Sequence, residues 1–406
     1  MLQNFISKQL FIIAILLFLL SGITGLLIRF NFAFPFQIGR YNHLVQGHSH
    51  VAFLGWGYLA TIGAIIHFFV PSNKLNNTYK ITLIIILIVV TLMLISFPTS
   101  GYKTFSIILL AVFGITSYVL SFRILKDMTI IGTSSKLIQY GIYYYLLSSL
   151  ATWFLVYVII SQGKTDLYYN TIYFYLHFLY NGFFVFALFG LLFKIFESQN
   201  INISEKYKKL FFIYLNSACI PAYFLSVLWS NVSSFFYVIG FISSILQLIS
   251  LLFLLKIISN VHSKLNWNFI SKLLLIFVIV AYSLKIGSQI LSSFPYFIEK
   301  SILLKTFFII GYLHLFTLAF MSVFLFLILA QLKKISFSTV LSRVGIVLFL
   351  IGVLFTEVIL FLQGFLYLCG FQPIEKYNFF LFIFSFVIVL GILGVFSTLF
   401  LHTKKA

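Results

Sequence analysis

Three histidines lie on long apolar segments at similar distances from the polar break that follows each segment. His50, His177 and His314 stand about 17 to 20 residues before those breaks. At a rise of about 1.5 Å per residue, the three imidazoles fall within one slab roughly 5 Å thick. Two imidazoles on different helices can bind opposite faces of a haem iron, so the shared depth predicts a metal or haem site.

His48 lies two residues before His50. Residues two apart on a helix point about 200° around the axis from one another, so the two rings cannot face the same partner. We expect one to be a ligand and the other to lie behind it or at the lipid boundary. Each membrane histidine has the alternative of a hydrogen bond to a neighbouring helix. His262 and His402 lie at segment ends and are interpreted as interfacial residues.

Other polar residues also interrupt the apolar segments, where an unpartnered polar side chain costs several kcal/mol. They are Asn181, Asn216, Lys285, Gln289, Glu357 and Gln363. Lys285 and Glu357 predict a structural ion pair or two separate polar contacts, with a proton-conducting element or a haem-propionate anchor as the alternative. Only 7 residues are acidic, so the sequence offers no chain of acidic relays and does not predict a proton pump.

The solvent of these segments is lipid. Of the 406 residues, 62% are hydrophobic and 8% are charged, well below the charge of a soluble domain. The net charge of +19 resides in the short breaks between apolar runs, as on the cytoplasmic face of a membrane protein. The sequence therefore predicts a multi-pass protein of the cytoplasmic (inner) membrane, whose surroundings are the lipid bilayer, with no nucleic-acid partner.

The sequence predicts that these polar residues are positioned by an all-α bundle of twelve membrane helices, which forms one integral domain over residues 1–406. Of the 26 Lys and Arg residues, 18 fall on one side, 7 fall on the other, and Lys285 lies inside a span, which puts both termini in the cytoplasm. Cys219 and Cys369 have no metal-site spacing. The predicted spans are 9–29, 47–70, 79–97, 104–125, 138–161, 169–193, 210–229, 233–257, 270–292, 303–331, 340–366 and 379–401.

Three short motifs resemble subunit I of haem-copper oxidases and nitric-oxide reductases. The run from Gly47 to Trp56 is similar to the family's second helix, whose histidine ligates the low-spin haem, and the similarity favours His50 over His48. The segment at His177 is similar to the sixth helix, whose histidine binds the second metal, although Asn181 replaces the glutamate of the reductases. The segment at His314 is similar to the tenth helix, which normally carries two histidines.

The departures from this family concern the second metal. The corresponding seventh helix carries a His-His pair, whereas residues 210–229 offer only Asn216 and Cys219. The resemblance therefore implies one b-type haem held by His50 and His314, and it does not support a copper or non-haem iron site. It also implies a role in electron transfer, or in nitric-oxide or oxygen chemistry or sensing, with a quinol or cytochrome as electron donor and with partner subunits. Metal binding at His177 stays open.

A twelve-span transporter or lipid-linked glycan exporter is the competing hypothesis. In such a protein the intramembrane His, Lys and Glu residues would bind substrate or protons. Transporters of this size often have related halves with helices broken by Gly or Pro at matching positions. The sequence contains only six prolines and lacks this pattern, which favours the haem protein, an oxidoreductase if it is an enzyme.

Overall fold

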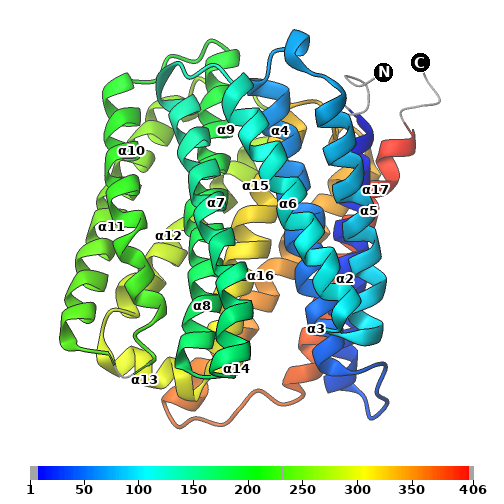
Figure 1. Cartoon of the computed structure of the whole chain (residues 1–406), viewed down its shortest axis with the longest axis vertical. Coiled ribbons are helices and arrows are strands. Elements are labelled where there is room, and N and C mark those ends of the chain that lie inside the picture. Colours follow the sequence, from blue (N-terminus) through cyan, green and yellow to red (C-terminus); the bar gives the residue numbers. More distant parts are fainter. Residues whose placement is uncertain (1–7, 231, 402–406) are drawn as a thin grey trace. The chain divides into compact units, whose positions relative to one another are not determined.

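The computed structural model describes residues 8–401 with the exception of position 231, and helix is the only regular secondary structure within them (Figure 1). In the N-terminal half, two predicted spans are continuous helices with a π-helical centre. The first consists of α3, η2 and α4, and the second consists of α8, η4 and α9. The bounds up to residue 198 are α2 Leu10–Ala33, α3 Tyr41–His50, η2 Val51–Tyr58, α4 Leu59–Phe69, η3 Ser72–Lys74, α5 Asn77–Ser100, α6 Thr104–Asp127, α7 Gly132–Ser161, α8 Asp166–His177, η4 Phe178–Phe184 and α9 Val185–Ser198.

The second half of the chain repeats this pattern once, in the run of α14, η6 and α15. Its bounds are α10 Glu205–Cys219, η5 Pro221–Ser226, α11 Ser234–His262, α12 Phe269–Leu291, α13 Pro295–Leu303, α14 Lys305–His314, η6 Leu315–Ser322, α15 Val323–Gln331, α16 Val340–Leu368 and α17 Tyr377–Leu401.

Eleven helices in the described residues are long and apolar enough to cross a membrane, against the twelve predicted. The difference lies at the predicted span 210–229. There α10 ends after 15 residues, and a short 3₁₀-helix, η5, follows from Pro221. Proline lacks an N–H group and disfavours α-helical geometry in the residue before it, which favours the end of the α-helix at this position.

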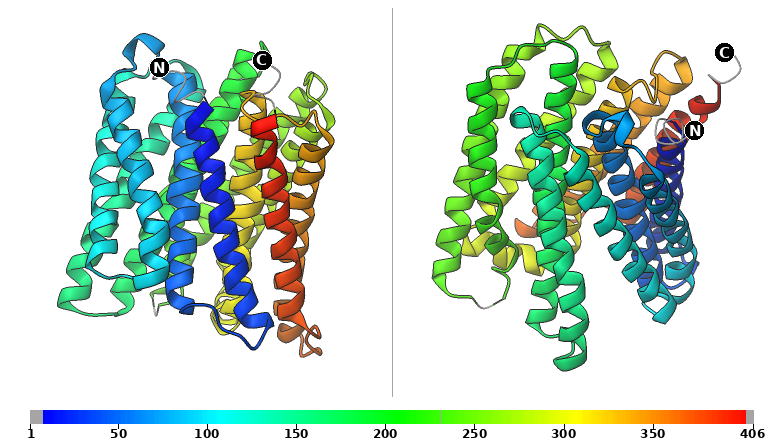
Figure 2. Two further views of the ribbon diagram at one scale, coloured as in Figure 1. Left: turned by 90° about the vertical axis from the view of Figure 1, so that its right-hand side faces the viewer. Right: turned by 45° about the horizontal axis from the view of Figure 1, so that its top comes forward.

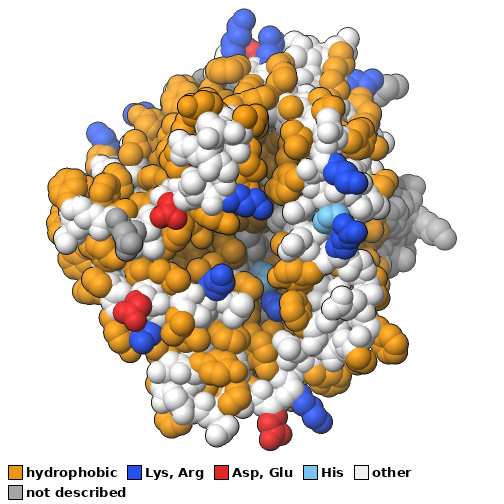
Figure 3. Space-filling view, turned by 60° about the horizontal axis from the view of Figure 1, so that its bottom comes forward, with side chains coloured by type: hydrophobic (Ala, Val, Ile, Leu, Met, Phe, Trp, Pro, Cys, Tyr) orange, Lys and Arg blue, Asp and Glu red, His pale blue; other side chains and the backbone are white. Residues whose placement is uncertain are grey.

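The outer faces of the helices are apolar. Large hydrophobic side chains such as Ile160 and Phe269 are 81% and 76% exposed. Figure 3 shows charged side chains singly or in small groups among hydrophobic ones on the face that it presents. Exposed apolar surface on this scale is unfavourable in water and is expected of a multi-pass membrane protein.

The chain divides into two compact units, and each is described by itself. Unit 1 comprises residues 1–128 and 322–406, and unit 2 comprises residues 129–321. In unit 1, α17 packs against both α16 and α2. The start of α2 and the end of α17 lie at the same end of this unit (Figure 2).

Glycines allow the close approach of α16 and α17 in unit 1. A Cβ atom on Gly391 would come within 2.5 Å of the Phe349 backbone nitrogen, and one on Gly345 within 2.9 Å of the Gly394 backbone. Helices in lipid gain stability from such close packing, because lipid tails provide no hydrophobic driving force between them. Larger residues at these positions would therefore separate the two helices.

In unit 2, α7 packs against α8, η4 and α9, and α11 packs against α10 and α12. Gly182 in η4 meets the Tyr144 side chain, where a Cβ atom would lie only 2.4 Å from that of the tyrosine. This contact places the Tyr144 hydroxyl beside α10, where it donates a 2.8 Å hydrogen bond to Asn216 Oδ1. The interior of unit 2 thus carries polar groups between its helices.

Candidate functional site

Each of the three histidines predicted to share a depth is the last residue of an α-helix that continues as a π-helix. His50 precedes η2, His177 precedes η4 and His314 precedes η6. Fewer than about 1% of residues in proteins are π-helical, and such segments occur frequently at functional sites. The structure therefore gives the three positions a common local geometry that the sequence pattern did not predict.

His48 has the hydrogen bonds of an oriented ligand. Its Nδ1 lies 2.8 Å from the carbonyl oxygen of Ser21, which accepts the Nδ1 proton. The Ser21 hydroxyl in turn donates to the His48 carbonyl over 3.0 Å. In the described part of the chain, Nε2 of His48 has no hydrogen-bond partner. When a backbone carbonyl accepts the proton of one ring nitrogen, it commonly orients the other nitrogen toward a metal.

Gly25 makes room for the His48 ring on α2. A Cβ atom at this position would lie 2.8 Å from His48 Cε1 and 3.1 Å from Nδ1. The half-buried imidazole therefore lies directly against the α2 backbone. Ser21 and Gly25 are one helical turn apart, and sequence reasoning did not identify either of them, because their role depends on a neighbouring helix.

His50 uses both of its ring nitrogens within the protein. Nδ1 donates to the Gln46 carbonyl over 2.8 Å, and Nε2 accepts a 3.2 Å hydrogen bond from the Tyr102 hydroxyl. The ring stacks on Phe97 with centroids 4.4 Å apart. Sequence similarity favoured His50 as the ligand, whereas these contacts favour His48.

A hydrogen bond in unit 1 joins the π-helix after His50 to the end of the π-helix after His314. Nε1 of Trp56 in η2 donates to Oγ of Ser322, the last residue of η6, over 3.0 Å. Trp56 is fully buried and stacks on Phe18 of α2 with centroids 4.8 Å apart. The bond therefore holds Ser322, the last residue of η6, against η2 within unit 1.

His177 is buried and contacts the end of α10. Its Nε2 donates to the Cys219 carbonyl over 2.8 Å, and Nδ1 accepts from the Asn181 side-chain amide over 3.3 Å. The Cys219 carbonyl needs this donor because the backbone N–H of Tyr223, four residues on, bonds instead the carbonyl of Ile220, the residue before η5. The structure therefore gives a reason for His177 to hydrogen-bond a neighbouring helix, which is the alternative to binding a metal.

The described residues contain no group of three or more His, Cys, Asp or Glu side chains placed to hold a metal ion. A haem needs only one protein ligand on each face, and His48 fits that requirement through its oriented ring and its available Nε2. His314 is half-buried at the end of α14, His262 is exposed at the end of α11, and His402 lies outside the described residues.

Lys285 and Glu357 have separate surroundings. Lys285 in unit 2 is 1% exposed, donates to Gln247 Oε1 over 3.1 Å and lies 5.5 Å from the centre of the Tyr282 ring. Glu357 in unit 1 is also buried, and neither of its oxygens has a hydrogen-bond partner among the residues described. Its charged neighbour is Arg29, which lies beyond ion-pair distance.

Comparison with known proteins does not assign the chain to a family. No protein-family model matches the chain, and no curated protein matches it. The resemblance to subunit I of the oxidases and reductases therefore stays a prediction from the three histidine motifs. The geometry at His48, His177 and Lys285 is independent of that similarity.

Proposed function

We propose that the chain is a haem protein of the inner membrane that binds one b-type haem through His48 and transfers electrons. The observation that carries the proposal is the orientation of the His48 ring in unit 1, where Nδ1 bonds the Ser21 carbonyl and Nε2 has no hydrogen-bond partner among the described residues. His314 is the second ligand that the sequence predicts, because the spans that carry the two histidines are predicted to cross the membrane in the same direction and to hold them at a similar depth.

The contacts of His48 support its role as one axial ligand. The Ser21 carbonyl holds the Nδ1 proton, which leaves the Nε2 lone pair for the iron and raises the basicity of the ring. Gly25 lets the imidazole lie close to α2 and so limits its rotation. In this proposal His50 is not a ligand, and its ring is held by hydrogen bonds with the Gln46 carbonyl and the Tyr102 hydroxyl.

Bis-histidine ligation determines which chemistry the haem would supply. A six-coordinate haem cycles between ferric and ferrous iron and has no open position for a substrate, so it is suited to electron transfer. The protein's part is to hold both imidazoles and to exclude water with residues such as Trp56 and Phe18, which are buried. A quinol or a cytochrome is proposed as the electron donor, in a complex with partner subunits.

Oxygen or nitric-oxide reduction at a second metal is not part of the proposal. His177, the remaining histidine of the set, uses both ring nitrogens in hydrogen bonds to Cys219 and Asn181. Asn181 is a neutral group, and a hard cation prefers a carboxylate. We therefore expect about one haem per chain, no stoichiometric copper and slow oxygen uptake.

An absorption spectrum of the purified protein with and without dithionite tests the proposal. Reduced b-type bands should appear in the wild type, disappear or change in His48→Ala and His314→Ala, and persist in His262→Ala. His50→Ala is the discriminating variant, because it should retain both axial ligands and shift the bands only slightly.

Two results would contradict this assignment. Loss of the haem in His50→Ala with retention in His48→Ala would return the ligand role to His50. Absence of haem from the wild-type protein, prepared with haem supplied during expression, would overturn the haem function and favour the transporter hypothesis.

A further inference from the structure

A cavity of about 360 Å³ opens in unit 2 between the start of α10 and the end of α11. Its polar lining consists of Asn202, Ser204, Tyr207, Asn260 and Lys264. The side chain of Ser204, at the N-cap position of α10, makes no capping hydrogen bond. The first backbone N–H groups of that helix also lack intrahelical partners and carry partial positive charge. The cavity thus has hydroxyl, amide and ammonium donors.

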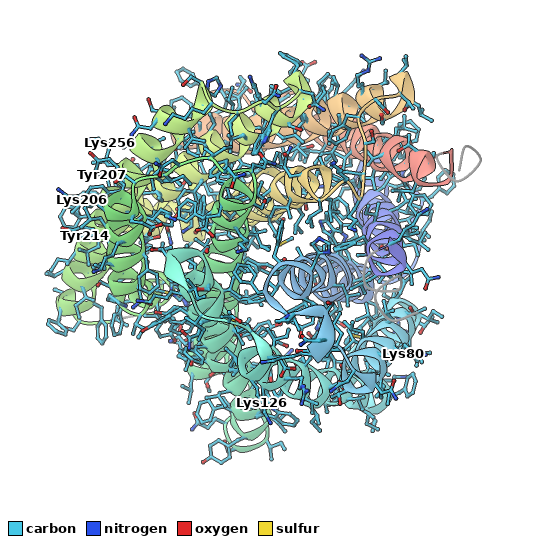
Figure 4. All side chains as sticks on the ribbon, turned by 90° about the horizontal axis from the view of Figure 1, so that it is seen from above. Lys80, Lys126, Lys206, Tyr207, Tyr214 and Lys256 are labelled. Atoms are coloured by element: carbon cyan, nitrogen blue, oxygen red, sulfur yellow. The ribbon has the colours of Figure 1, made fainter. Side chains whose placement is uncertain are left out.

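The charge around this cavity is positive. Lys256 lies with its Nζ 4.7 Å from the centre of the Tyr207 ring, and its proximity lowers the pKa of Tyr207. The two nearby carboxylates, Glu197 and Glu205, already pair with the buried Lys208. Figure 4 shows Lys206, Tyr207 and Lys256 close together at the margin of the protein. Lys206, Lys256 and Lys264 form no ion pair within the described residues.

An aromatic stripe leads away from the cavity along α10 and α11. The Phe253 ring stacks between those of Tyr207 and Tyr214, with centroid distances of 6.2 Å and 5.8 Å. Leu252 and Leu255 on α11 are exposed beside Phe253, at 57% and 38%. A ligand that fits both features has an anionic head and an apolar tail.

We propose that this cavity binds the phosphate headgroup of an anionic phospholipid, whose acyl chain lies along the stripe of Tyr207, Phe253 and Tyr214. The cavity lies on the predicted cytoplasmic side, where anionic lipids are abundant and nearby lysines attract them. Free phosphate shares the head chemistry but makes no use of the aromatic stripe. The lipid site is independent of the proposed haem function.

Thermal unfolding of the full-length protein in neutral detergent tests this site. Added phosphatidylglycerol should raise the midpoint by several degrees more than phosphatidylcholine does. In Lys256→Gln/Lys264→Gln the affinity for phosphatidylglycerol should fall by roughly tenfold or more. Lys80→Gln/Lys126→Gln is the matched control, since it removes the same charge from the same predicted membrane side in unit 1 (Figure 4).

Each outcome decides the proposal. Loss of the lipid effect in the cavity variant alone supports it. An equal loss in both variants would mean diffuse attraction to the basic surface and would overturn the site. If inorganic phosphate reproduces the full effect of phosphatidylglycerol on the wild type, the ligand is a free anion and the lipid assignment fails. The same holds if Phe253→Ala leaves the lipid affinity unchanged.

Discussion

The Trp56 indole and the Ser322 hydroxyl, 266 positions apart in the sequence, form a buried 3.0 Å hydrogen bond. The bond joins the second predicted span to the tenth within unit 1. Trp56 belongs to η2 and Ser322 ends η6, so the contact joins two π-helices that each follow a candidate haem ligand. It fixes the position of Ser322 beside η2 within unit 1.

Removing the acceptor of this hydrogen bond should destabilise the protein. Ser322→Ala leaves the buried indole N–H without its partner, at an expected cost of about 1–3 kcal/mol in the free energy of unfolding. Unfolding by sodium dodecyl sulfate in mixed micelles measures this change. If the haem is bound as proposed, the variant should also shift its reduced absorption bands.

Ser148→Ala is the control for Ser322→Ala. Ser148 is buried in α7, and its hydroxyl bonds only the Tyr145 carbonyl of its own helix, so we expect a loss below about 1 kcal/mol. Trp56→Phe combined with Ser322→Ala should cost less than the sum of the single changes. Strict additivity would show that the two residues do not interact.

Lys285 and Gln247 provide a second test, because Lys285 has an amide partner and no carboxylate within ion-pair distance. Gln247→Leu should destabilise the protein by about 1.5–3 kcal/mol, since it leaves a buried ammonium group without its acceptor. Lys285→Met removes the desolvation cost of the charge and should be neutral or stabilising. Unfolding in mixed micelles measures both variants. A loss in Lys285→Met as large as that in Gln247→Leu would contradict this account.

His177 is predicted to stabilise the end of α10. His177→Ala should reduce stability by about 1–3 kcal/mol, because the Cys219 carbonyl loses its donor inside the protein. The haem spectrum and the metal content should stay as in the wild type. Elemental analysis of the purified variants measures the latter.

Asn181→Leu is the matched variant for His177→Ala. It removes the weaker 3.3 Å hydrogen bond and also a buried Oδ1 that has no partner, so its cost should be smaller. Loss of a bound metal ion from His177→Ala would show that the histidine is a ligand and not a helix cap.

The sequence predicted the positions of the helices well, because a bilayer demands about 20 apolar residues for each crossing. The predicted span 104–125, for example, corresponds to Thr104–Asp127. It did not predict the π-helices. Segments such as Val51–Tyr58 and Leu315–Ser322 are apolar nearly all around, and such a pattern does not distinguish one helical period from another.

The candidate site was predicted in outline only. Polar residues inside apolar segments identified His48, His177 and Lys285, but their partners lie on other helices: Ser21, the Cys219 carbonyl and Gln247. The choice between His48 and His50 depends on which ring nitrogen is already bonded, and spacing along one helix does not contain that information. The break at Pro221 was also missed, since the hydropathy of residues 210–229 stays high across it.

The twelfth crossing can be decided by fusions on either side of α10. From Leu210, about ten α-helical residues and the six residues of η5 would rise about 27 Å together, close to the thickness of the hydrocarbon core. Lys206, Lys208 and Lys209 precede this segment, and the positive-inside rule predicts that its start lies on the cytoplasmic side. We therefore expect a fluorescent reporter to be active after Lys209 and an alkaline phosphatase to be active after Ser233. Fusions after Lys136 and Lys103 serve as cytoplasmic and external controls. If the positions after Lys209 and Ser233 lie on the same side, the chain has eleven crossings and its two termini lie on opposite sides of the membrane. The helices that carry His48 and His314 would then cross the membrane in opposite directions, which contradicts the predicted common depth of the two histidines.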